Sequence, residues 1–313
     1  MTESPQAAGL AGLLESGPWP LDGGLASELA ERGCDITGHL WSARLLREDP
    51  DAIRAVHEAY LRSGARVVIS ASYQASRQGF AAVGLDARQA DDLLRLSVDL
   101  ARAARDAVAT EPGLDPGLVA ASVGPYGAIG HDGGEYRGRY GLSHAQLVAF
   151  HRERIDVLAA AGPDLLAVET IPDADEAAAL VDVLADHADL PAWMTFTCGD
   201  DARLWAGQPI EEAVAAAAAA PSVRAVGVNC TAPELVTPLL ERIAGSGVGL
   251  PVVVYPNAGF GWDPSTSTWT GVGTDVLPDP VVREWVDRGA VLVGGCCGLG
   301  PRAVRGIAGA LGR

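Results

Sequence analysis

Short apolar runs of strand length alternate along the chain with longer segments whose apolar residues recur at helical spacing. Most of the apolar runs are rich in small or β-branched residues, and nearly all end in polar residues or glycine. The pattern predicts strands at 19–24, 66–73, 118–123, 165–168, 192–197, 225–228, 251–255 and 290–293. It predicts helices at 25–30, 42–62, 88–109, 143–161, 173–187, 209–220, 233–244, 280–288 and from 301 onward.

Local signals mark several element boundaries. Pro50 indicates a restart inside the second helical segment, and Ser143 with Gln146 has the spacing of a capping box. The connection after the third strand runs through His131 to Gly141, which is long for a loop in a compact domain. We expect this connection to be functional.

Eight strand-then-helix units in succession favour an α/β fold of one domain, the (β/α)₈ barrel of the TIM type. A doubly wound open sheet is the other arrangement of alternating strands and helices. It is disfavoured because no G-x-G-x-x-G sequence follows the first strand and polar residues end nearly every strand. We expect a loose N-terminal arm at 1–17, with at most a short helical turn, and a barrel domain at 18–313.

Composition narrows the class of protein and its partners. The 313 residues are 48% hydrophobic and 20% charged, as in a globular protein with a full core. The formal net charge of −17 disfavours nucleic acid and anionic membranes as partners but would tolerate a cationic ligand. No basic segment leads into an apolar one near the N-terminus, and the apolar run at 213–220 is too short to span a bilayer. With a sparse, odd set of five cysteines, these features predict a cytoplasmic protein.

Polar residues at the strand ends are the candidates for chemistry, because the C-terminal ends of barrel strands meet at one active-site mouth. No histidine clearly ends a strand, so the sequence offers no Ser-His-Asp or Cys-His arrangement for nucleophilic catalysis. We expect the following side chains to face one cavity: Asp22, Tyr73, Tyr126, Glu169, Asn229, Cys230, Asn257, Cys296 and Cys297.

Cys296 and Cys297 lie between glycines at the end of the last predicted strand. Adjacent cysteines are poorly placed to form a disulfide with each other, so they suit either a metal ion or packing as small apolar residues. Barrel geometry adds Cys230, which ends the sixth strand and comes near the eighth in a closed ring. Three thiolates with one open position match a catalytic zinc site, where a substrate thiol would be held as its reactive thiolate.

Seven short motifs lie at or near the predicted strand ends: Asp22-Gly23-Gly24, Ala71-Ser72-Tyr73-Gln74, Gly124-Pro125-Tyr126-Gly127, Glu169-Thr170, Gly227-Val228-Asn229-Cys230, Tyr255-Pro256-Asn257 and Gly294-Gly295-Cys296-Cys297-Gly298. Together they resemble the homocysteine S-methyltransferase family. The resemblance covers essentially the whole chain. It implies a zinc-dependent (β/α)₈ barrel that transfers a methyl group to homocysteine and yields methionine.

The resemblance also implies roles for individual residues. Cys230, Cys296 and Cys297 match the zinc ligands. Asp22 and Glu169 match the acids that hold the amino group of homocysteine, and two carboxylates at the rim suit an ammonium group. Further residues expected to bind the substrates are Trp41, Tyr73, Gln74, Tyr126, Asn229 and Asn257, and Trp262 is another aromatic candidate for stabilising a cationic donor.

The methyl donor is less closely specified. The compact length and the Leu40-Trp41-Ser42-Ala43 segment resemble the branch that uses S-methylmethionine, and S-adenosylmethionine is a second sulfonium donor in the family. Betaine-dependent members carry extra C-terminal sequence, and cobalamin-dependent members carry a D-x-H-x-x-G stretch, neither of which we find here. Selenocysteine is another acceptor in the family. The non-catalytic alternative is a barrel whose zinc is structural and which serves as a binding protein, and the sequence leaves the oligomeric state open.

Overall fold

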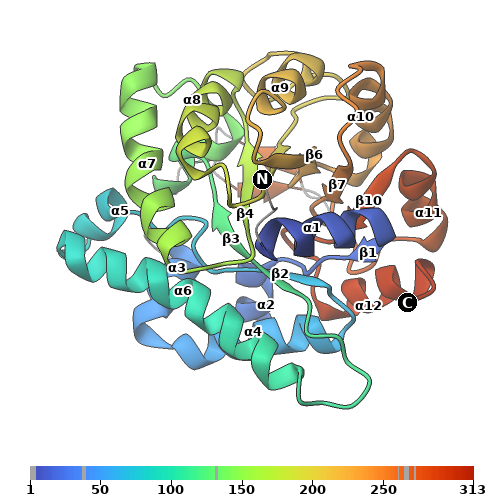
Figure 1. Cartoon of the computed structure of the whole chain (residues 1–313), viewed down its shortest axis with the longest axis horizontal. Coiled ribbons are helices and arrows are strands. Elements are labelled where there is room, and N and C mark those ends of the chain that lie inside the picture. The colour runs from blue at the N-terminus through green and yellow to red at the C-terminus, as the bar shows by residue number, and fades with distance from the viewer. Residues whose placement is uncertain (1–4, 37–39, 131–132, 260, 264–267, 271–272) are drawn as a thin grey trace.

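The structure is a computed structural model of the chain, and it describes all residues except 1–4, 37–39, 131–132, 260, 264–267 and 271–272. Eight parallel strands form the central sheet, and helices surround it (Figure 1). The strands of this sheet are β1 (Trp19–Pro20), β2 (Val67–Ile69), β3 (Leu118–Val123), β4 (Leu165–Ile171), β5 (Ala192–Phe196), β6 (Val223–Asn229), β7 (Val252–Tyr255) and β10 (Ala290–Val293).

The sheet closes into a barrel. Its strands follow the order β1-β10-β7-β6-β5-β4-β3-β2, and each neighbouring pair is parallel. The two ends of this order are joined by backbone hydrogen bonds, from Arg66 N to Pro20 O at 2.8 Å and from Asp22 N to Val67 O at 3.2 Å. The predicted (β/α)₈ barrel is therefore confirmed.

The helices outside the barrel lie close to their predicted positions, except for the short helix at Arg77–Ala81, which the sequence analysis did not predict. They are α2 (Leu25–Glu31), α3 (Trp41–Glu48), α4 (Pro50–Arg62), α5 (Arg77–Ala81), α6 (Ala87–Val108), α7 (His144–Ala160), α8 (Ala174–Leu184), α9 (Ile210–Ala217), α10 (Pro233–Gly245), α11 (Asp279–Asp287) and α12 (Pro301–Ala310). The predicted restart at Pro50 and the capping box of Ser143 and Gln146 are both present. Among the described residues, no helix has the length and apolar character needed to cross a membrane.

Side chains along each strand alternate between two apolar layers. Val67 and Ala120 belong to the cluster inside the barrel, whereas the next residue Val68 and the preceding residue Val119 belong to the cluster between strands and helices. Trp193 is fully buried and belongs to the cluster inside the barrel. Burial on both faces explains why the strands appear in the sequence as nearly continuous apolar runs.

The N-terminal segment is a helix and not the loose arm expected from the sequence. α1 (Pro5–Ser16) lies across the end of the barrel at which the strands begin (Figure 1). Its Leu10, Leu13 and Leu14 are at most 8% exposed and pack with interior residues such as Val67. A helix of this length is marginal by itself, and the burial of its leucines against the barrel stabilises it. α1 therefore covers the end of the barrel opposite the strand C-termini.

Two loops contain structure beyond the predicted pattern. The long connection after β3 holds the 3₁₀ turns η1 (Tyr126–Ile129) and η2 (Gly134–Tyr136). A third 3₁₀ turn, η3 (Ala185–His187), lies outside these loops and extends α8. Between β7 and α11, strands β8 (Gly261–Asp263) and β9 (Thr268–Thr270) form an antiparallel pair. Both loops leave the C-terminal ends of barrel strands, the side on which active sites of this fold are built.

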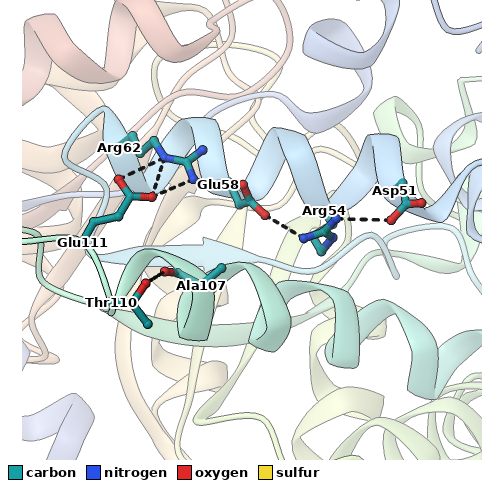
Figure 2. A network of polar contacts seen from close by, with 7 residues as sticks. All are labelled: Asp51, Arg54, Glu58, Arg62, Ala107, Thr110 and Glu111. Atoms are coloured by element: carbon teal, nitrogen blue, oxygen red, sulfur yellow. Dashed lines mark hydrogen bonds and ion pairs between the residues drawn. The ribbon is translucent and has the colours of Figure 1, made fainter.

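Ion pairs link the outer face of α4 to the segment after α6. Arg62 pairs with Glu58 at 3.0 Å and with Glu111 at 2.7 Å, and Arg54 pairs with Glu58 at 3.1 Å (Figure 2). Exposed pairs of this kind contribute little to stability because water screens their charges. The buried apolar layers, and not this network, hold the fold together.

Replacement of Leu10 with Ala tests the packing of α1. Leu10 is fully buried, so the variant should lose about 2–5 kcal/mol of unfolding free energy through lost contacts and the cavity left behind. Gly12→Ala is the matched control, because a Cβ there meets no atom within 4 Å and alanine favours helix. Denaturant unfolding followed by circular dichroism measures both. Wild-type stability of Leu10→Ala would show that α1 does not pack on the barrel.

Candidate active site and metal centre

A pocket of about 110 Å³ lies among the C-terminal ends of the barrel strands. It is lined by Asp22, Gly23, Gly24, Leu25, Ala26, Ser27, Ile69, Ser70, Ala71, Tyr73, Glu135, Tyr136, Glu169, Thr170, Cys230, Tyr255, Gly295, Cys296 and Cys297. The expectation of one shared cavity is met by the side chains of Asp22, Tyr73, Glu169, Cys230, Cys296 and Cys297. The strand ends thus bring together residues that lie far apart in the sequence.

Three sulfur atoms meet in this pocket. The Sγ atoms of Cys230, Cys296 and Cys297 all lie within 4.8 Å of one another. The distance is 3.6 Å between Cys230 and Cys297 and 4.0 Å between Cys296 and Cys297. A tetrahedral zinc ion with Zn–S bonds of about 2.3 Å would hold its sulfurs about 3.8 Å apart. The cluster therefore fits such an ion with only small shifts, and three donors leave a fourth position open.

Close backbone packing holds the turn that carries two of the cysteines. Cys296 N donates to Pro256 O at 2.7 Å, which ties the turn to the end of β7. A side chain at Gly295 would place its Cβ 2.5 Å from Leu299 Cβ, so only glycine fits there. The glycine that precedes the Cys296–Cys297 pair thus lets the chain fold tightly at this position.

The three thiols hold their protons unequally. Hydrogen bonds from Cys296 and Cys297, together with the Tyr136 hydroxyl 3.2 Å from Cys230 Sγ, lower the pKa of Cys230. Hydrogen bonding to Cys230 in turn raises the pKa values of Cys296 and Cys297. A metal ion needs all three as thiolates, so its binding would release protons and tighten as pH rises.

Two buried carboxyl groups lie in the same pocket. Asp22 is 3% exposed and Glu169 is 7% exposed. Asp22 Oδ2 accepts a hydrogen bond from Ile69 N at 2.7 Å, and Glu169 Oε1 accepts one from the Ser122 hydroxyl. Burial raises the pKa of Asp22 and raises that of Glu169 to about 7. A cation entering the pocket would lower both pKa values and favour the charged forms.

A chain of hydrogen bonds supports Glu169 from the barrel interior. Hydrogen bonding with Tyr255 lowers the pKa of Glu169 against the effect of burial. The Tyr255 hydroxyl accepts from Trp193 Nε1 at 3.1 Å and lies 2.8 Å from Thr195 Oγ1. All of these groups are buried, so the orientation of the carboxylate is set before any ligand binds.

The charges of the pocket favour cationic ligands. Its described lining contains three carboxyl groups and no lysine, arginine or histidine. The third acid, Glu135, is 4% exposed and comes from η2 in the loop after β3. A positively charged group is therefore attracted to this pocket, whereas a multiply charged anion would be repelled.

Four residues expected to bind substrates do not line the pocket: Gln74, Tyr126, Asn229 and Asn257. Gln74 donates to the backbone of the loop after β3, and Tyr126 packs against aromatic rings of that loop and of α7. Asn257 Nδ2 donates to Cys230 O at 3.4 Å. Successive residues at the end of a strand point in different directions, so a residue beside a pocket residue can face away.

The loop after β3 supplies two pocket residues that the sequence did not single out. Glu135 and Tyr136 both belong to η2 and line the pocket. The unusual length of the loop was the only signal for them. Two aromatic candidates, Trp41 in α3 and Trp262 in β8, have side chains outside the part of the chain that the structure describes.

Asn229 joins the strand ends that carry Glu169 and Cys230. Its Oδ1 accepts from Thr170 N at 2.7 Å and from Thr195 Oγ1 at 2.8 Å, and its Nδ2 donates to Thr170 Oγ1 at 2.7 Å. Thr170 and Cys230 have φ angles of 60° and 46°, in the left-handed region. Such a conformation costs about 1–3 kcal/mol for a non-glycine residue. Asn229 thus stabilises the backbone of the site and does not face the pocket.

Replacement of Asn229 with Ala should weaken both the fold and the metal site. The variant leaves the buried Thr170 N without its acceptor, so the unfolding free energy should fall by about 2–4 kcal/mol and metal affinity by at least about tenfold. Thr195→Val is the control, because it removes one bond to Asn229 and leaves those to Thr170. Denaturant unfolding and competition with a chelator measure both quantities. Equal loss of metal affinity in the two variants would contradict this role.

Comparison with known proteins agrees with the geometry. The family model described as homocysteine S-methyltransferase matches residues 20–311. The chain is 45% identical to the homocysteine S-methyltransferase of Escherichia coli strain K12 over 294 residues, which cover 92% of this chain and 93% of the relative. It is 42% identical to a selenocysteine Se-methyltransferase of Brassica oleracea var. italica, with coverage of 94% and 89%.

A solved structure shares the fold over the whole length. The metallated form of the homocysteine methyltransferase MmuM from Escherichia coli superposes with a TM-score of 0.86 at 43% sequence identity. The match covers 96% of this chain and 99% of that one. Similarity of this extent, together with the family model, shows shared ancestry and not only a shared barrel. The chain belongs to the homocysteine S-methyltransferase family.

Proposed function

We propose that this enzyme transfers a methyl group from a sulfonium donor to the thiol of L-homocysteine and yields methionine, with a zinc ion held by Cys230, Cys296 and Cys297. The observation that carries the proposal is the set of three sulfurs at zinc spacing in a pocket that also holds two buried carboxyl groups. The metallated form of the Escherichia coli relative supports a metal at this site. Zinc is the ion that best suits three thiolate ligands.

Asp22 and Glu169 bind the amino group of the acceptor. The ammonium pairs with the two carboxylates, and its charge offsets the burial that raises their pKa values. The carboxylate of the acceptor depends on neutral donors, since no described lining residue carries a positive charge. Tyr255 and Ser122 hold Glu169 in place, so the acceptor meets a preorganised partner.

The reaction is a displacement at carbon between two sulfurs. Bound zinc would keep the acceptor thiol ionised and nucleophilic at neutral pH. The acceptor sulfur forms a bond to the methyl carbon while the bond from that carbon to the donor sulfur breaks, and the donor leaves as a neutral thioether. The leaving group takes no proton, so no general acid is required.

The charges of the pocket also bear on the donor. Three carboxyl groups and the rings of Tyr73 and Tyr136 surround the site, and an aromatic face stabilises a nearby cation by about 1 kcal/mol. A sulfonium ion carries the positive charge that these carboxyl groups and aromatic rings favour. S-methylmethionine is our first candidate and S-adenosylmethionine the second, while betaine is a cation of another class that needs to be tested beside them.

The three-cysteine site favours a catalytic over a structural metal. A structural zinc normally has four protein ligands, and among the described residues three cysteines converge. All five cysteines are free thiols, and a thiolate metal site would be lost if they were oxidised. We therefore also propose that the enzyme works in a reducing compartment, the cytoplasm.

A methyl-transfer assay with S-methylmethionine, S-adenosylmethionine and betaine side by side tests the function. Transfer to L-homocysteine should be fastest with a sulfonium donor, and selenocysteine should be included as a competing acceptor because a 42% identical relative carries that name. Cys297→Ser should lose tight zinc binding and lower the rate by at least about 100-fold, since it removes one of three ligands. Full activity with stoichiometric zinc in this variant, or transfer from betaine alone, would sink the proposal.

The pKa of Glu169 predicts how acceptor binding depends on pH. Because the pKa of the carboxyl is about 7 and its charged form binds the ammonium, affinity for L-methionine should fall about tenfold per pH unit below 7. L-methionine has no thiol to titrate, so calorimetry on zinc-loaded enzyme isolates the carboxyl groups. Glu169→Gln should bind L-methionine weakly, and its affinity should depend less steeply on pH. The remaining pH dependence comes from Asp22, whose pKa is also raised by burial. Identical pH profiles for both proteins would contradict the assignment.

A further inference from the structure

The hydroxyl of Tyr136 lies 3.2 Å from Cys230 Sγ, and the contact is buried. A thiolate can only accept a hydrogen bond, so the hydroxyl donates whenever Cys230 is ionised as a metal ligand. We propose that this hydrogen bond keeps Cys230 in its role as a ligand and prevents its sulfur from taking the methyl group meant for the acceptor. The inference rests on the proposed function, because a methyl donor in this pocket is what puts the sulfur at risk.

The reaction requires selectivity among sulfurs. The acceptor thiolate and the thiolate of Cys230 would lie at one ion and within reach of one donor. Attack by Cys230 would form a bond from its Sγ to the methyl carbon, break the bond from that carbon to the donor sulfur and release the donor as a neutral thioether. The resulting S-methylcysteine carries no charge and is a much poorer zinc ligand than a thiolate. A single such event would inactivate the enzyme.

A hydrogen bond to a thiolate reduces this risk. It withdraws electron density from the sulfur, and a less basic sulfur is a weaker nucleophile. The effect is larger in a buried site than in water, because little solvent competes for the donor or the acceptor. A hydroxyl directed at Cys230 therefore lowers the nucleophilicity of this sulfur relative to an acceptor sulfur without such a donor. Tyr136 is a positioning residue in this scheme, because it acts through Cys230.

The fold around η2 holds the hydroxyl in place. The ring of Tyr136 packs edge-on against Trp205, with 6.1 Å between ring centroids and 68° between ring planes. Three residues later, Arg139 N donates to Asp173 Oδ2 at 2.9 Å, and Arg139 Nε donates to Ala206 O at 2.9 Å. These contacts anchor the loop after β3 to the loops that follow β4 and β5. A phenylalanine at 136 keeps an aromatic ring against Trp205 and removes the hydroxyl.

Tyr140 offers a matched control in the same loop. Its hydroxyl is 3.2 Å from Glu176 Oε2, and the residue does not line the pocket. Tyr140→Phe therefore removes one hydroxyl from the loop without touching the sulfurs. Cys34, which is partly exposed and lies outside the cluster, provides an internal reference for the reactivity of an ordinary thiol.

The test treats zinc-loaded enzyme, without homocysteine, with methyl iodide and maps methylated cysteines by peptide mass spectrometry. Methyl iodide needs no donor site, so the result does not depend on which donor the enzyme uses. Methylation of Cys230, relative to Cys34, should be about tenfold faster in Tyr136→Phe than in wild type, with zinc released at the same rate. Tyr140→Phe should match wild type. Equal rates at Cys230 in the two variants would overturn the inference.

Two further measurements keep the outcomes distinct. If Tyr136→Phe does not fold, 3-fluorotyrosine at position 136 keeps the hydroxyl as a stronger donor and should slow methylation of Cys230 below the wild-type rate; an unchanged rate would count against the role of Tyr136. A parallel reaction with S-methylmethionine tests the proposed function. No transfer from it to homocysteine by the wild type would refute that donor, while the difference with methyl iodide would still support Tyr136.

Discussion

Closure of the sheet is the constraint on which the site depends. β6 and β10 are separated only by β7, so the strand ends that carry Cys230 and the Cys296–Cys297 turn lie two strand spacings apart, about 10 Å. The left-handed backbone at Cys230 and the glycine-framed turn bring the sulfurs across this gap to within 4.8 Å. The site is therefore a property of the closed ring, and a shift in the pairing of β7 with either neighbour would separate the ligands.

The pocket buries acidic groups whose charged forms lose the solvation of water. Raising the pKa of Glu169 from 4.5 to about 7 corresponds to about 3 kcal/mol of lost stability at a pH above both values. The folded protein holds this proton more tightly than the unfolded chain, so the unfolding free energy falls as pH rises from 4.5 through 7. Apolar burial elsewhere in the barrel offsets this cost. A cation bound in the pocket would favour the charged form of Glu169 and so offset this loss.

The order of helices and strands could be predicted because the burial of apolar side chains controls it. Strands buried on both faces must be apolar throughout, and helices packed on them need apolar residues at helical spacing, so the chain itself displays all eight units. Polar residues at the strand ends likewise predicted the position of the pocket, and the three cysteines among them lie together in the structure. The prediction of a loose N-terminal arm was wrong. The segment forms α1, whose stability comes from leucines buried against the barrel, and this packing leaves no clear signal in the local sequence.

The sequence by itself determined the barrel, the three clustered cysteines and the two acids beside them, since each follows from residue type at the end of a strand. Only the tertiary structure decided which neighbours face the pocket. Asn229 turns away to hold Thr170, while Tyr136 reaches Cys230 from a loop whose residues have no periodic pattern. Strand patterning specifies two alternating faces, but the direction of a side chain beyond a strand end depends on backbone angles and contacts that residues distant in sequence impose.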